Sequence, residues 1–201
     1  CLSRIAAHDW PIVTLHDAAL PLTPHTPLIY NIYSRVMYWR IRQKANAILT
    51  VSEFSRHASL EKGGILGIPM TVTLLGVDPT WFTSTKTPSP YPFKYLVYVG
   101  NLKPHKNLTR LLQAFKTVDT DYKLVCVGPF RKLKSRDNRA HELMRQMSDR
   151  VIFTDELTGE PLRAIVKNAE GLVLPSTYEG FGLPPLEAMA SRVPVLASWA
   201  L

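Results

Sequence analysis

The chain has 201 residues, of which 46% are hydrophobic and 20% are charged, and its formal net charge is +8. This composition is globular and excludes a disordered or low-complexity chain. No apolar run is long enough to span a bilayer, and the two cysteines, Cys1 and Cys126, suggest neither a disulfide framework nor a metal site.

The first part of the chain alternates predicted strands and helices. Apolar residues after Pro11 predict a buried strand that ends with His16 and Asp17 on the side where parallel sheets bind ligands. The Ser52 hydroxyl suits a helix N-cap, and Gly63 suits the end of that helix. The predicted elements are strands at 11–17, 45–51 and 70–75, and a helix from 52 to about 61.

Residues 28–44 carry apolar side chains at helical spacing on two sides, which predicts a helix with a wide apolar surface. The basic residues of the same segment leave two interpretations open: a helix packed within the protein, which we favour, or an interfacial helix in peripheral contact with a membrane. The apolar stripes are Leu28, Ile32, Val36, Trp39 and Tyr30, Tyr33, Met37, Ile41; the basic residues are Arg35, Arg40, Arg42 and Lys44.

Residues 83–92 consist mainly of Thr, Ser, Pro and Lys, a composition typical of a linker. We therefore predict a domain boundary near residue 86, which gives domains at 1–85 and 86–201. In the second domain, strands alternate with helices, which predicts an α/β fold with a doubly wound parallel sheet. The predicted strands are 94–99, 122–127, 151–153, 171–174 and 194–197, and the helices begin near 108, 137, 160 and 184.

A group of basic residues lies between two of these elements. We favour the interpretation that these residues lie in solvent at the start of a helix. Binding of nucleic acid is the alternative, although neither a helix-turn-helix nor an aromatic platform accompanies the group. The residues are Arg131, Lys132, Lys134, Arg136 and Arg139.

The segment after the strand at 171–174 has the chemistry of a ligand site. Gly180 and Gly182 allow a ligand to approach the backbone, and the helix that follows offers unpaired amides to an anion. The carboxylates of Glu179 and Glu187 would repel a phosphate but accept hydrogen bonds from hydroxyl groups. A diphosphate between two polyols, as in a nucleotide sugar, fits this layout.

The loop at 100–107 also follows a strand and precedes a helix, so it should lie at the same edge of the sheet. Lys103 and Lys106 bring positive charge to this loop. Lysine can stabilise a departing diphosphate without a metal ion. If this loop is considered alone, the alternative is that both lysines are exposed to solvent and bind no ligand.

The spacing Glu179-x7-Glu187, with Gly-Phe-Gly-Leu-Pro between, resembles the E-x7-E motif of family 4 retaining glycosyltransferases, which have the GT-B fold. The loop at 100–107 is similar to the Gly-x-Leu-x-Pro-x-Lys-Asn loop of that family, and residues 47–55 and 76–82 resemble the end of its first domain. The resemblance extends from about Pro11 to Ala197.

This resemblance implies two Rossmann-like domains, both incomplete here. Residues 1–85 would be the C-terminal part of the acceptor-side domain, and 86–201 a truncated donor domain. The implied reaction moves a hexose, with mannose favoured, from a GDP- or UDP-linked sugar to a glycan or lipid-linked acceptor, with retention. We expect this piece alone to be inactive, and the whole protein to be cytoplasmic, with the inner face of the membrane as a further option.

The resemblance also implies the site residues. Glu179, Lys106 and His16 are the implied catalytic residues, and no metal or other cofactor is expected. Two positions depart from the family, because Asn101 and His105 stand where many relatives carry Arg, which lowers the positive charge of the loop. The implied donor-binding residues are Gly100, Asn101, Lys103, His105, Gly180, Phe181, Gly182, Leu183 and Glu187.

Three further functions remain open beside the transferase, one of which is the binding of nucleic acid by the basic group described above. A sugar-nucleotide epimerase of the same fold would act without an acceptor. A non-catalytic nucleotide-sugar binding module would bind the donor without turnover.

Overall fold

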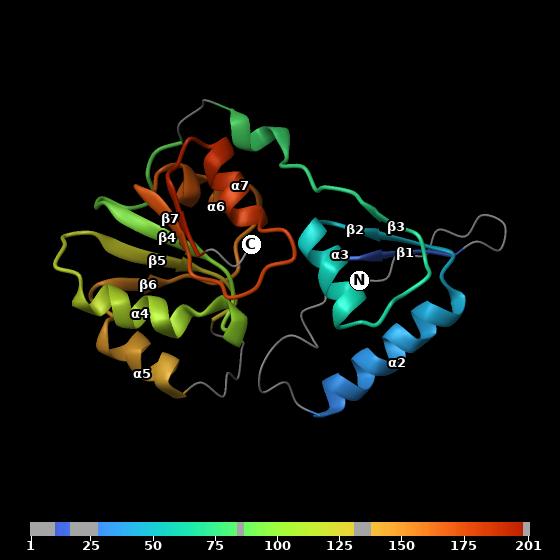
Figure 1. Ribbon diagram of the computed structural model, residues 1–201. Coiled ribbons are helices and arrows are strands. Elements are labelled where there is room, and N and C mark those ends of the chain that lie inside the picture. Colours follow the sequence, from blue (N-terminus) through green and yellow to red (C-terminus); the bar gives the residue numbers. More distant parts are fainter. Residues whose placement is uncertain (1–10, 17–27, 84–86, 131–137, 199–201) are drawn as a thin grey trace. The chain divides into compact units, whose positions relative to one another are not determined.

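A computed structural model describes residues 11–16, 28–83, 87–130 and 138–198 (Figure 1). The chain divides into two compact units. Among the described residues, the first contains those up to Gly76 together with Tyr178–Gly182, and the second contains Val77–Thr177 and those from Leu183 to 198.

The division at Gly76 lies ahead of the predicted boundary near residue 86. The segment between them packs with the second unit, because the Trp81 side chain is 5% exposed and belongs to a core of that unit. The Lys167 ammonium also donates to the carbonyl oxygens of Thr80 and Thr83, at 3.1 and 3.2 Å. The assignment of the two parts as acceptor-side and donor-side domains stays a prediction.

The first unit has a three-stranded parallel sheet in the order β1-β2-β3 (Figure 1). The predicted strands and helices are all present, and the Ser52 side chain caps α3 by accepting from the Ser55 amide. The core of this unit contains Leu15, Tyr38, Ile41, Ala45, Ile48 and Ile65. The elements are β1 (Ile12–Leu15), α2 (Leu28–Lys44), β2 (Ala47–Thr50), α3 (Glu53–Glu61) and β3 (Met70–Val72).

The second unit has a five-stranded parallel sheet in the order β6-β5-β4-β7-β8. Helices cover both faces (Figure 1), so the predicted doubly wound α/β sheet is confirmed. The strands are β4 (Tyr95–Val99), β5 (Lys123–Val127), β6 (Val151–Phe153), β7 (Gly171–Leu174) and β8 (Val195–Ala197). The helices are α4 (Leu108–Thr117), α5 (Asn138–Gln146), α6 (Gly159–Lys167) and α7 (Leu183–Ala190).

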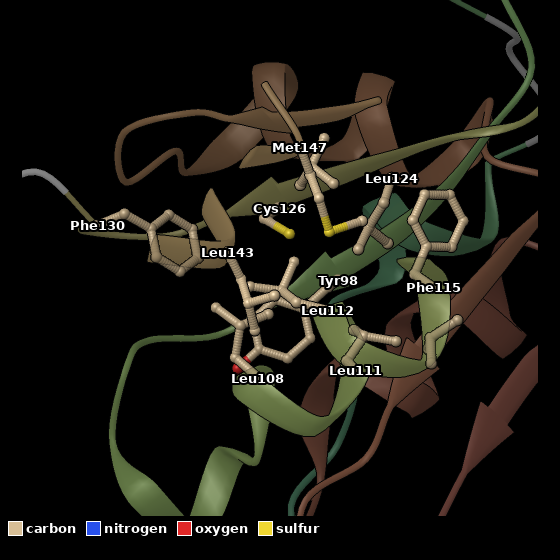
Figure 2. Close-up of a cluster of buried hydrophobic side chains, with 12 residues drawn as sticks. Tyr98, Leu108, Leu111, Leu112, Phe115, Leu124, Cys126, Phe130, Leu143 and Met147 are labelled. Carbon is tan, nitrogen blue, oxygen red and sulfur yellow. The ribbon is translucent and has the colours of Figure 1, made fainter. Parts of the chain in front are cut away.

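A hydrophobic cluster fills the space between this sheet and α4 and α5 (Figure 2). Leu112 of α4 and Leu124 and Cys126 of β5 are fully buried in it. Cys126 is therefore a core residue of this unit, and burial raises the pKa of its thiol well above the ordinary value. The thiol stays protonated and acts as a small apolar side chain.

Two short 3₁₀ helices were not predicted: η1 (Pro79–Phe82) and η2 (Pro104–Lys106). Both begin with proline, whose fixed φ suits a first helical position. The Asp78 carboxylate caps η1 by accepting from the Thr80 amide at 2.8 Å. One turn of helix carries no repeating apolar pattern, so the sequence periodicity could not reveal either element.

The basic residues Arg131–Arg136 lie outside the described residues, and so does the side chain of Arg139. Within the described ranges, every helix is too short or too polar to cross a bilayer. The same ranges contain no group of three or more His, Cys, Asp or Glu side chains placed to hold a metal ion.

Candidate functional site

The loops that follow β4 and β7 meet at the carboxyl edge of the second unit's sheet, where β4 and β7 are neighbours. The Thr177 amide and hydroxyl donate to the His105 carbonyl oxygen at 2.8 and 3.3 Å. The Asn107 amide side chain donates to the Pro175 carbonyl oxygen at 3.1 Å. The two predicted site loops of this unit are thus joined, although they are about 70 positions apart in the sequence.

The start of the first loop is fixed by close backbone packing. The Gly100 amide donates to the Val127 carbonyl oxygen at 3.0 Å. A Cβ atom at Gly128 would lie 1.8 Å from the Gly100 carbonyl oxygen, so only glycine fits there. The Asn101 carboxamide oxygen accepts from the Lys103 amide at 3.0 Å, which closes a turn that an Arg side chain, having no acceptor, could not close.

Both lysines of the loop lie in or beside η2. Lys103 is exposed and Lys106 is half-buried. The Lys106 amide donates to the Lys103 carbonyl oxygen at 2.9 Å, which holds the two residues in one turn. Asn107 follows with φ 54°, a left-handed conformation that asparagine tolerates, and turns the chain into α4.

The loop after β7 contains a buried hydroxyl that no motif indicated. Ser176 is 1% exposed, and its Oγ has no hydrogen-bond partner among the described residues. Its carbonyl oxygen accepts a bond from the Ser198 hydroxyl, which anchors the backbone. A buried hydroxyl without a partner is costly, and a ligand oxygen could supply the missing bond.

The predicted order of strand, glycine loop and helix is present from β7 to α7. Gly182 has φ +83°, which favours glycine, and it directly precedes α7. Pro184 and Pro185 have no amide hydrogen, so two of the donors that a helix start normally offers are missing. The donors left to an anion at this end are the amides of Gly182 and Leu183.

Glu187 lies on α7 and is half-buried. Burial raises the pKa of its carboxyl above the ordinary value of 4.5. The described part of the chain supplies no hydrogen-bond or ion-pair partner for this carboxylate. Such a group favours an incoming hydroxyl donor, which would replace the water that burial removes.

The segment Tyr178–Gly182 belongs to the first unit. The Ser52 and Ser55 hydroxyls, at the start of α3, donate to the Gly180 carbonyl oxygen at 2.5 and 3.1 Å. The Phe54 ring packs edge-on against Tyr178, with 5.1 Å between the ring centroids. We call this arrangement, made by Ser52 and Ser55, the serine clamp.

The serine clamp also reaches the end of β1. The Ser55 hydroxyl is 3.4 Å from the His16 carbonyl oxygen, and the His16 side chain is exposed directly after the strand. Glu179, one residue before the clamped Gly180, is 9% exposed. Within the first unit, the carbonyl oxygens of His16 and Gly180 therefore both lie close to the Ser55 hydroxyl.

The structure thus places the predicted site residues in two groups. His16 and Glu179 to Gly182 lie in the first unit, and Gly100 to Lys106, Leu183 and Glu187 lie in the second. Sequence reasoning identified Ser52 only as a cap and did not identify Ser55, Ser176 or the Asn107 side chain as parts of the site. The Ser-x-x-Ser pattern at the start of the helix is visible in the sequence. The Gly180 carbonyl group that it binds, 128 positions from Ser52, has no signal in the sequence.

Comparisons with known proteins found a matching family model, curated relatives and solved structures. The family model described as glycosyl transferases group 1 matches residues 80–200. The O-antigen chain mannosyltransferase RfbU of Salmonella typhimurium is 28% identical over 92% of this chain and 51% of its own length. The MMP alpha-(1->4)-mannosyltransferase of Mycolicibacterium hassiacum is 31% identical over 99% of this chain and 51% of its own.

A solved structure shows the same fold. HepE of Anabaena, in complex with UDP-glucose, has a TM-score of 0.74 and 22% identity over 94% of this chain and 53% of its own. The predicted GT-B type fold is confirmed by this likeness. This chain spans about half the length of the curated relatives it matches. Because the family model covers more than half of the sequence, the chain belongs to the glycosyl transferases group 1 family.

Proposed function

We propose that the chain is part of a retaining glycosyltransferase that takes a hexose from a nucleotide diphosphate sugar. The half-buried carboxylate of Glu187, which has no partner among the described residues, carries the proposal, because it suits hydroxyl donors such as those of a ribose. The family and the two mannosyltransferase relatives support sugar transfer and favour mannose. The complex of HepE with UDP-glucose supports a nucleotide-sugar donor.

In the proposed mechanism, Lys106 and the amides of Gly182 and Leu183 hold the diphosphate, and Glu179 and His16 hold the donor sugar. The bond between the sugar's anomeric carbon and the phosphate oxygen breaks, and its electron pair leaves with the diphosphate. The acceptor hydroxyl attacks the same face of the sugar, and its proton passes to the departing phosphate oxygen. Lys106 offsets the negative charge that develops on the leaving group.

Calorimetric titration of the chain with GDP-mannose, UDP-glucose, GDP and UDP tests this proposal. We expect one base to bind preferentially, and Lys106→Ala to weaken that binding by about 10- to 100-fold, the effect of a lost bond to a charged group. Lys94→Ala is the matched control, because Lys94 is exposed and precedes β4, whereas the Lys106 loop follows it. Binding that Lys106→Ala leaves unchanged would contradict the assignment.

A further inference from the structure

The loop that follows β7 holds Lys106 from both sides. On one side, the His105 carbonyl oxygen accepts from the Thr177 amide and hydroxyl at 2.8 and 3.3 Å. On the other side, the Asn107 carboxamide donates to the Pro175 carbonyl oxygen at 3.1 Å. We call these contacts of His105 and Asn107 with the β7 loop the lysine bracket. The backbone of Lys106 is thereby tied to the end of β7 through both of its neighbours.

The turn that contains Lys106 is too small to keep its shape without outside contacts. Helix η2 has three residues, and its bonds run from the Lys106 amide to Lys103 and from the Asn107 amide to Pro104, at 2.9 and 3.1 Å. A single 3₁₀ turn has poor hydrogen-bond geometry and is marginal by itself. The lysine bracket therefore supplies the contacts that fix this turn.

Asn107 suits the lysine bracket because it combines two properties. Its φ is 54°, a left-handed conformation that glycine, asparagine and aspartate adopt more readily than other residues. Of these three, only asparagine has a side-chain hydrogen-bond donor at neutral pH. Asn107 also stands at the N-cap of α4, but its side chain makes no cap bond with that helix. The side chain thus contacts the β7 loop and not its own helix.

The β7 loop is itself anchored on its other side. Strand β7 lies between β4 and β8 in the sheet. The Ser198 residue, directly after β8, donates from its hydroxyl to the Ser176 carbonyl oxygen and from its amide to the Leu174 carbonyl oxygen, the second bond at 3.1 Å. Bonds from both neighbouring strand ends therefore hold the segment 175–177, and the lysine bracket joins Lys106 to a fixed support.

We propose that Asn107 is a positioning residue for donor binding, because its bond to the Pro175 carbonyl group places Lys106 to meet the diphosphate. A lysine side chain has a flexible stem and loses much rotamer freedom when it binds a ligand. A backbone that is fixed in advance lowers the ordering cost that accompanies binding. The inference rests on the proposed function, since it requires that Lys106 binds the diphosphate. Asn107 acts through Lys106 and makes no contact of its own with the nucleotide.

A double-mutant cycle, measured by calorimetric titration of the chain with GDP and UDP, tests the proposal. Asn107→Gly keeps the left-handed backbone accessible and removes the donated bond. We expect it to weaken binding of the preferred nucleotide by about 2- to 10-fold, the effect of one neutral hydrogen bond. In a Lys106→Ala background, the same substitution should weaken binding by less than about twofold, because its effect passes through the lysine.

Asn168→Gly is the matched control. Asn168 lies in the same unit outside the two loops, and its carboxamide donates to the Thr87 carbonyl oxygen at 3.0 Å. It should lower the melting temperature at least as much as Asn107→Gly does and leave nucleotide affinity unchanged. Hydrogen exchange of the Thr177 amide, measured without nucleotide, should rise by about 2- to 10-fold in Asn107→Gly and stay unchanged in the control.

The possible outcomes separate this inference from the proposed function. If the unsubstituted chain binds a nucleotide and Asn107→Gly binds it equally well, the inference is overturned and the proposed function stands. Losses that add in full in the double variant would also overturn it, because Asn107 would then act without Lys106. Equal losses of affinity in Asn107→Gly and Asn168→Gly would show only a general effect on stability. Absence of GDP and UDP binding by the unsubstituted chain would contradict the proposed function, and this inference with it.

Discussion

At the scale of the residue, Glu187 combines a cost in stability with a proposed role in binding. Its pKa is raised because burial disfavours the charged carboxylate. The folded chain therefore binds this proton more tightly than the unfolded chain does, so protonation stabilises the fold. That stabilisation is complete below the unfolded value of 4.5 and is lost as the pH rises through the higher folded value.

Glu187→Gln should therefore raise the melting temperature at about pH 7 and leave it nearly unchanged at about pH 4. The same variant should bind the preferred nucleotide about 10- to 100-fold more weakly at neutral pH, because a charged acceptor is lost. Calorimetric melting and titration of one sample measure both effects. Glu170→Gln, at an exposed position just before β7, is the control. A variant that loses stability at neutral pH would show that the carboxylate has a favourable partner.

At the scale of the element, α3 has two functions at its first turn. Ser52 caps the helix by accepting a bond, and the serine clamp holds the Gly180 carbonyl oxygen by donating bonds. A substitution can separate the accepted cap bond from the donated bond to Gly180. An aspartate caps a helix as well as serine does, but it has no hydrogen to donate when it is ionised.

Ser52→Asp with Ser55→Ala should keep α3 folded and release the segment 178–182. We expect amide hydrogen exchange in this segment to rise by about fivefold for each bond lost, since a typical bond contributes about 1 kcal/mol. Mass spectrometry of exchanged peptides resolves this segment from α3. Ser52→Ala is the comparison variant, because it removes the cap as well and costs about 1 kcal/mol of helix stability. Unchanged exchange at 178–182 would show that other contacts hold Glu179 in place.

At the scale of the whole molecule, each unit has its own core. Ile48 is fully buried in the first unit, and Leu112 is fully buried in the second, between α4 and the sheet (Figure 2). Leu112→Ala should destabilise the second unit by about 2–5 kcal/mol, and Ile48→Val the first by about 0.5–1.5 kcal/mol. Hydrogen exchange of peptides from β5 and from β2 should report the two effects separately. Equal loss of protection in both units after either substitution would show that they unfold as one.

The sequence by itself determined the alternating elements, the parallel doubly wound sheet and the two loops with site chemistry. These follow from local signals: apolar periodicity over a few residues, and glycine or proline where the backbone turns. The motif from Glu179 to Glu187 also indicated the family, which the comparisons confirm. The roles of the individual site residues stay predictions.

Only the tertiary structure decided which distant residues meet. It placed Trp81 in the core of the second unit, joined Gly180 to the serine clamp, and brought the Asn107 side chain to the Pro175 carbonyl group. None of these has a local signal, because burial and hydrogen bonding across a hundred positions depend on how the completed sheets bring loops together. A sequence pattern shows that a helix face is apolar, but packing decides whether that face is covered.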